Sequence, residues 1–137
     1  MSITAQQNLI DGIYSAISTA IGLANPSGQL IDVYELEAPQ DSSLPVCTFQ
    51  LISDVVTHNI TDCKWSDGIL QIDFFGNKRL GSKVLRTISD TLFTDMVNST
   101  LTVAGGVSAR ITGTESGVVT IEENIIHIRQ EYNLLIV

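Results

Sequence analysis

Few residues of this 137-residue chain have types and spacings suited to catalysis. The signatures GxGxxG, GxxxxGK[ST], HExxH and GxSxG do not occur, so the sequence offers no nucleotide loop, zinc-protease helix or nucleophile elbow. We expect His58, in a polar segment, and His127, on the outward phase of a strand, to be surface residues. Glu122 and Glu123 are adjacent, and neighbours on a strand point to opposite faces. We therefore predict no enzyme activity, no catalytic residue, no metal site and no cofactor.

The composition indicates a single packed domain over residues 1–137. Hydrophobic residues make up 44% of the chain, and the net charge is -8, so its overall field does not favour binding to phosphate backbones. Cys47 and Cys63 are too few for a disulfide framework or a zinc site, and Cys47 is expected to be a buried hydrophobe. We expect no secretory signal at the N-terminus and no membrane-spanning run.

One group of charged residues has an unusual arrangement. Basic residues precede acidic ones along a predicted helix, which opposes the helix dipole at both ends. The residues are Lys78, Arg79, Lys83, Arg86, Asp90 and Asp95. They either point into water, with an Arg86–Asp90 pair of little energetic value, or meet complementary charges on another copy in a head-to-tail contact. The start of the helix could also bind a free phosphate.

The elements that position these charges follow from hydrophobic periodicity. Leu70, Ile72 and Phe74 alternate with polar residues, which predicts a strand across residues 68–75. Apolar residues then recur every three or four positions over 82–96, which predicts an amphipathic helix. This strand and helix should bury their apolar faces against each other at the centre of the core.

The remaining segments add a second helix and further strands. The helix is expected over about residues 4–22, after a capping box at Thr4 and Gln7. Strands are expected at 30–36, from 46, at 100–104, 107–112 and 119–121, with a turn at 114–117, and along the C-terminus from 124. The fold class is therefore α+β, with two amphipathic helices on one face of a largely antiparallel, mixed sheet.

A polar segment between two of these strands is predicted to form a protruding hairpin near residues 53–68. Trp65 lies in it, together with Asp54, Asp62 and Asp67. Exposed aromatic residues are common where partners dock, so Trp65 could belong to a docking loop. Alternatively, its ring folds back over the sheet.

Three stretches of the chain resemble the tail-terminator, or tail-completion, family of long-tailed bacteriophages. They are VYELEAPQDSSLPV at 33–46, IDFFGNKRLGSKVL at 72–85 and HIRQEYNLLI at 127–136. The family often has an aromatic residue after the Leu-Pro of the first stretch, where this chain has Val46. The resemblance covers almost the whole chain through turn and core positions.

The resemblance implies a structural virion protein, assembled in the host cytoplasm and located in the tail or neck. Such proteins form a homo-oligomeric ring, commonly a hexamer, between the tail-tube protein and the head or neck connector. DNA passes through the lumen without specific binding, and acids such as Asp54, Asp62 and Asp67 could line that passage. Two alternatives remain: another ring-forming neck, adaptor, stopper or tail-tube protein, and a small-ligand-binding α+β domain with a deep pocket.

Overall fold

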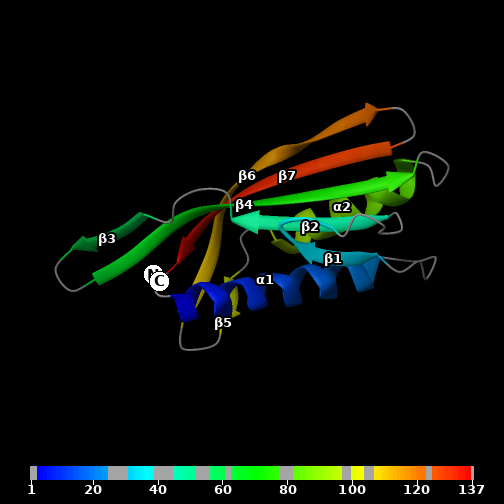
Figure 1. Ribbon diagram of the computed structural model, residues 1–137. Coiled ribbons are helices and arrows are strands. Elements are labelled where there is room, and N and C mark those ends of the chain that lie inside the picture. The colour runs from blue at the N-terminus through cyan, green and yellow to red at the C-terminus, as the bar shows by residue number, and fades with distance from the viewer. Residues whose placement is uncertain are drawn as a thin grey trace.

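The structure, a computed structural model, describes residues 3–24, 31–38, 45–51, 56–60, 63–77, 82–96, 100–103, 107–122 and 125–136. Two helices and seven strands follow one another along these segments (Figure 1). Their bounds are α1 Ile3–Ala24, β1 Asp32–Glu35, β2 Val46–Leu51, β3 Val56–Ile60, β4 Cys63–Asn77, α2 Ser82–Met96, β5 Thr100–Val103, β6 Val107–Glu122 and β7 Ile125–Ile136.

Both helices are amphipathic, as their sequence periodicity predicts. The buried stripe of α1 consists of Leu9, Ile13, Ile17 and Ile21, spaced four residues apart. The buried stripe of α2 consists of Leu85, Ile88, Leu92 and Met96. Spacings of three and four residues place these side chains on one side of each helix, so each helix has a single face to bury.

The strands form a mixed sheet in the order β1-β2-β4-β7-β6-β5, with β3 paired to β4 outside this path. The β1–β2 pair is parallel, and the other pairs are antiparallel. The prediction of an α+β fold with a largely antiparallel, mixed sheet is confirmed. Because β4 pairs along most of its length with β7 and also with β2 and β3, it holds the sheet together.

The sheet curls around α1. This helix contacts both edge strands, β1 and β5, although they lie at opposite ends of the strand order. It also contacts α2, which packs over β4 and β7. The apolar phases of the strands and the stripes of both helices therefore meet in one hydrophobic core. The opposite face of the sheet has no helix over it among the described elements (Figure 1).

The first part of β4 pairs with β3 as a hairpin that extends away from the helices in Figure 1. Trp65 lies within β4, opposite His58 in the register. The described residues of the segment predicted as a hairpin near 53–68 are therefore paired strands, and β4 begins several residues earlier than the strand predicted over 68–75.

One sequence prediction is wrong: residues 114–117 do not end a strand. They lie inside β6, which pairs with β7 through two register shifts, between Ile111 and Gly113 and between Glu115 and Val118. The polar and glycine residues that suggested a turn are instead accommodated as irregularities of the kind that bulges produce. The long β7 provides a continuous partner that keeps the strand together.

Candidate interaction surfaces

A cluster of polar side chains surrounds Asp73 on the helix-free face of the sheet. Asp73 is only 6% exposed and accepts hydrogen bonds from two strands. Gln71 Nε2 donates to Oδ2 at 2.8 Å, and Arg129 Nε donates to Oδ1 at 2.9 Å. His127 Nε2 lies 2.7 Å from the same Oδ1. The register of β4 against β7 creates the cluster, because it sets Asp73 opposite Arg129 and Phe75 opposite His127.

These hydrogen bonds decide the charge of Asp73. Burial by itself would raise the pKa of the carboxyl group. The bonds from Gln71, His127 and Arg129, together with the guanidinium charge, outweigh burial and hold the pKa of Asp73 below its usual value. Asp73 is therefore ionised at neutral pH and can only accept hydrogen bonds, so Nε2 of His127 carries a proton and donates it.

The cluster holds Arg129 in a fixed orientation. Its Nε is bound to Asp73, while the side chain remains 47% exposed. Within the described part of the chain, its two terminal nitrogens have no hydrogen-bond partner. Beside it, the rings of Phe75 and His127 stack with centroids 4.5 Å apart and an interplanar angle of 8°. We call Arg129 with this ring pair the Arg129 platform. A guanidinium held in this way can bind a carboxylate or a phosphate through two parallel hydrogen bonds.

The sequence indicated the face on which these residues lie but not that they meet. Strand alternation placed Asp73 on the outward side of β4 and His127 and Arg129 on the outward side of β7. Asp73 and His127 are 54 positions apart, so only the strand register shows the contact. His127 is part of a polar cluster and is not an isolated surface residue.

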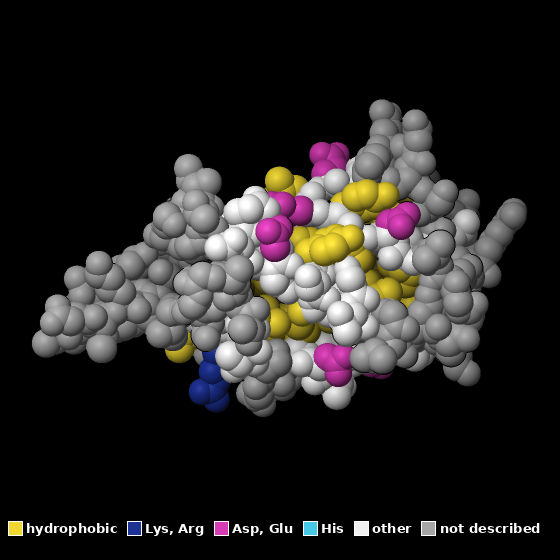
Figure 2. All heavy atoms as spheres, turned by 90° about the horizontal axis from the view of Figure 1, so that it is seen from below, with side chains coloured by type: hydrophobic (Ala, Val, Ile, Leu, Met, Phe, Trp, Pro, Cys, Tyr) yellow, Lys and Arg dark blue, Asp and Glu magenta, His cyan; other side chains and the backbone are white. Residues whose placement is uncertain are grey.

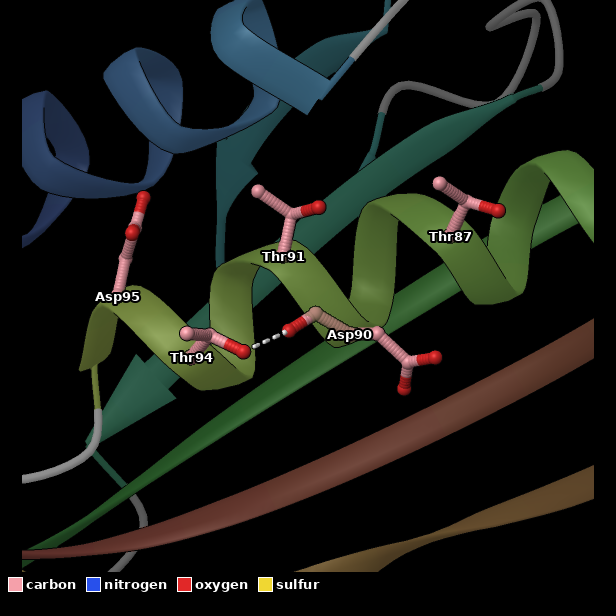
Figure 3. Close-up of a pocket in the computed structure, with 5 residues that line it drawn as sticks. All are labelled: Thr87, Asp90, Thr91, Thr94 and Asp95. Carbon is pink, nitrogen blue, oxygen red and sulfur yellow. Dashed lines mark hydrogen bonds between the residues drawn. The ribbon is translucent and has the colours of Figure 1, made fainter.

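A second surface is the outer side of α2, where a shallow depression of about 310 Å³ lies (Figure 3). It is lined by Thr87, Asp90, Thr91, Thr94 and Asp95, all from this helix. Thr94 Oγ1 donates to the backbone carbonyl of Asp90 at 3.0 Å. In Figure 3 the Thr87, Thr91 and Asp95 side chains point one way from the helix and Asp90 points another, so the polar groups do not converge on one ligand position.

The remaining residues proposed for the interface have the following positions. Arg86, Asp90 and Asp95 are exposed on α2, and Asp67 is exposed on β4. Arg86 and Asp90 are both described but form no ion pair. Lys83 lies in α2 and Trp65 in β4, but their side chains fall outside the description. Lys78, Arg79, Asp54 and Asp62 lie outside the described residues.

Cys47, the described cysteine side chain, is fully buried among core residues. Burial raises the pKa of the thiol, and the nearby charge of Asp73 raises it further. Among described residues, no three or more His, Cys, Asp or Glu side chains are grouped so that they could hold a metal ion. In the same part of the chain, neither helix is long and apolar enough to cross a membrane.

Comparison with known proteins gives matches in structure only. No protein-family model matches the chain, and no curated protein matches it. A solved chain whose name states no function is similar with a TM-score of 0.66 and 14% identity, over 93% of this chain and 94% of the other. A chain from the virion of a native gene transfer agent particle is similar with a TM-score of 0.63 and 14% identity, over 98% of both chains. The fold of this chain is therefore one that also occurs in a virion.

Proposed function

We propose that the chain is a structural, non-enzymatic subunit of a phage-like virion. The observation that carries this proposal is the similarity along 98% of both chains to a component of a gene transfer agent virion. Because the match extends over the whole fold, it involves the two helices, the curled sheet and the hairpin together. The resemblance of residues 33–46, 72–85 and 127–136 to tail-terminator proteins supports the same class independently.

Within that class, the finer proposal is a tail terminator. The subunits form a ring, hexameric as in the family that the sequence resembles, at the head-proximal end of the tail tube. The ring stops tube polymerisation and provides the joining surface for the head or neck connector. A net charge of -8 per subunit suits a lumen through which DNA passes without binding. Asp67 is an exposed acid in the described residues that could face such a lumen.

Electron microscopy of the purified protein, alone and mixed with preformed tail tubes, tests this role. A terminator gives rings that sit at tube ends and stop tube growth when tube subunits are added. A head-to-tail adaptor or stopper would bind the connector without binding bare tubes. Long tubes formed by the protein itself would contradict the proposal and identify a tube subunit instead.

The charged surface of α2 is proposed as one contact between neighbouring subunits. Reversal of an exposed charge in that contact, by Arg86→Glu, should weaken self-association while the subunit stays folded, because it replaces an attraction by a repulsion. Arg110→Glu is the matched control, since Arg110 is an exposed arginine of β6. Light scattering gives the assembly mass and circular dichroism the fold. Equal masses for the wild type and both variants would remove Arg86 from the contact.

A further inference from the structure

Two exposed hydrophobic residues lie at the same edge of the molecule. Tyr14 of α1 is 46% exposed, and Leu36, which follows β1, is 63% exposed. Both adjoin Phe49 of β2: the Tyr14 and Phe49 ring centroids are 6.4 Å apart, and the Leu36 amide donates to the Phe49 carbonyl at 2.8 Å. Tyr14 and Leu36 are thus two exposed hydrophobic residues next to the same core residue, and we call the pair the Tyr14–Leu36 patch.

Leu36 occupies a backbone conformation that leucine rarely adopts. Its φ is 67°, and the Glu37 amide donates to the Glu35 carbonyl at 2.8 Å, which closes a three-residue turn around it. A side chain with a Cβ is strained in this region, whereas glycine is not. Because Leu36 is also largely exposed, neither the turn nor the core of the subunit explains why a leucine occupies this position. Binding to a partner would explain it.

The surroundings of the patch are acidic. Asp11 lies on α1 near Tyr14, and Glu35 and Glu37 flank Leu36; all three are exposed. In Figure 2, which views the molecule from the side of α1, hydrophobic side chains lie exposed among acidic ones, and among the coloured, described residues a Lys or Arg side chain is seen only at the margin of this face. The patch therefore suits a partner surface that combines an apolar area with a positive charge.

The Arg129 platform has that chemistry. The stacked rings of Phe75 and His127 supply a partly exposed aromatic pair, and the Arg129 guanidinium is held beside it by Asp73. The platform lies on the helix-free face of the sheet, away from the core, whereas the patch lies where α1 meets β1. One copy can therefore present its patch to the platform of the next copy.

We propose that the Tyr14–Leu36 patch of one subunit binds the Arg129 platform of a second copy, with a carboxylate of Glu35 or Glu37 on the guanidinium. This inference rests on the proposed function, since it supplies a second pair of contacting surfaces for the ring, in addition to α2. The two surfaces differ, so the contact is head-to-tail and can close a ring. A second copy is favoured over DNA because the chain has 15 acidic and 7 basic residues and the patch is apolar.

The first test removes each surface separately. Arg129→Ala removes the platform charge, and the double substitution Tyr14→Ser with Leu36→Gly removes the patch. We expect each variant to weaken self-association by about tenfold or more in sedimentation velocity, because central aromatic and arginine residues dominate interface energies. Arg110→Ala is the matched control and should assemble like the wild type at 0.15 M salt, where charge repulsion between subunits is largely screened. The single substitution Leu36→Gly should not lower the thermal unfolding midpoint, because glycine relieves the backbone strain of the turn. Any loss of assembly in this single variant therefore cannot be attributed to unfolding.

Mixing the two variants tests the head-to-tail geometry. At a concentration where each variant is monomeric, the Arg129→Ala copy keeps an intact patch and the double variant keeps an intact platform. A one-to-one mixture should therefore give a heterodimer and no larger species. Monomers only in the mixture, or wild-type assembly by either variant, would overturn the proposal. So would a wild type that stays monomeric at every concentration examined.

Two further measurements separate this inference from the proposed function and from DNA binding. If the variants keep wild-type self-association and the wild type still caps tail tubes, the inference fails and the proposed function stands. If self-association depends on Arg129 but tubes are not capped, the proposed function fails and the inference stands. If Arg129→Ala reduces binding to a double-stranded DNA fragment and leaves self-association unchanged, the platform is a phosphate site and the inference fails.

Discussion

Asp73 shows how a buried charge can be retained on the face of a sheet that has no helix over it. A carboxylate removed from water needs hydrogen bonds and a counter-charge, or it becomes protonated instead. Donors from Gln71 in its own strand and from His127 and Arg129 in β7 meet that need. The same bonds fix the orientation of Arg129, so the stabilisation of one residue positions another for contact.

The lowered pKa of Asp73 predicts a loss of stability in acid. The folded pKa lies below the ordinary value of about 4, so the contribution of Asp73 is fully present above about pH 4 and is lost as the pH falls through the folded pKa. In Asp73→Asn this contribution is absent at every pH. We therefore expect the stability difference between the wild type and Asp73→Asn to shrink as the pH falls from 6 towards 2. Urea unfolding at a series of pH values measures it.

If the stability difference between the wild type and Asp73→Asn stayed constant from pH 6 to pH 2, Asp73 would titrate alike in the folded and unfolded chain, contrary to this prediction. Asp11→Asn is a suitable control, because Asp11 is an exposed acid on α1. Its hydrogen-bond partner is Gln7 within the same helix. The Asp11→Asn substitution should therefore change the pH dependence of the free energy of unfolding less than Asp73→Asn does.

At the scale of the elements, hydrophobic periodicity predicted the bounds of a helix that depends on its own sequence. It failed for strands whose length depends on pairing with another strand. The bounds 82–96 predicted for the second helix are those of α2, because its apolar stripe is regular and a glycine precedes its first residue in the sequence. The predicted turn at 114–117 was wrong because local composition cannot reveal the long partner strand β7 that keeps β6 extended. The extension of β4 to Cys63 depends in the same way on β3.

Gln130 is a polar residue at a strand position where the pattern of β7 calls for an apolar one. It lies on the apolar phase of β7, between Ile128 and Tyr132, and is only 4% exposed. Its Nε2 donates to the Ser89 Oγ at 2.6 Å and to the Ser89 carbonyl at 2.9 Å, and its Oε1 accepts from Tyr132 Oη at 2.5 Å. The buried amide thus connects β7 to α2 and orients a buried tyrosine. Gln130 shares the strand phase of Ile128 and Tyr132, but strand alternation alone gives no sign of its partner Ser89 on α2.

Replacement of this amide should be costly although leucine has a similar size. Gln130→Leu leaves the Tyr132 hydroxyl and the Ser89 hydroxyl without their partner, and each unsatisfied buried group costs about 1–3 kcal/mol. We expect a decrease in the free energy of unfolding of about 2–4 kcal/mol, measured by urea denaturation. In a Tyr132→Phe background, one of the two orphaned groups is already removed, so the same substitution should cost less. An equal loss of stability from Gln130→Leu in the wild type and in Tyr132→Phe would show that Gln130 and Tyr132 are not coupled by this hydrogen bond.

At the scale of the molecule, the curled sheet separates two kinds of surface. Curling around α1 brings both edge strands to that helix and leaves the other face of the sheet, which carries Asp73 and Arg129, without a helix among the described elements. The Tyr14–Leu36 patch, with its acidic neighbours, and the Arg129 platform therefore lie on different sides of the fold. Strand phases could predict the composition of each face. They could not predict the curl, which arises from the β4–β7 and β6–β7 registers and from the packing of α1 against both edges.

The net charge of -8 predicts how assembly should depend on salt. Like-charged subunits repel one another over distances that reach about 30 Å at 0.01 M salt but only about 8 Å at 0.15 M. The proposed contact acts at short range, combines apolar area with a partly buried charge pair, and is screened much less. Self-association of the wild type should therefore strengthen between 0.01 and 0.15 M salt, as measured by sedimentation velocity at fixed concentration and pH. Arg110→Ala, which adds to the negative charge without touching the contact, should show a steeper increase. Association that weakens steadily from the lowest salt would mean that opposite-charge attraction dominates the contact, and that the apolar Tyr14–Leu36 patch contributes little to it.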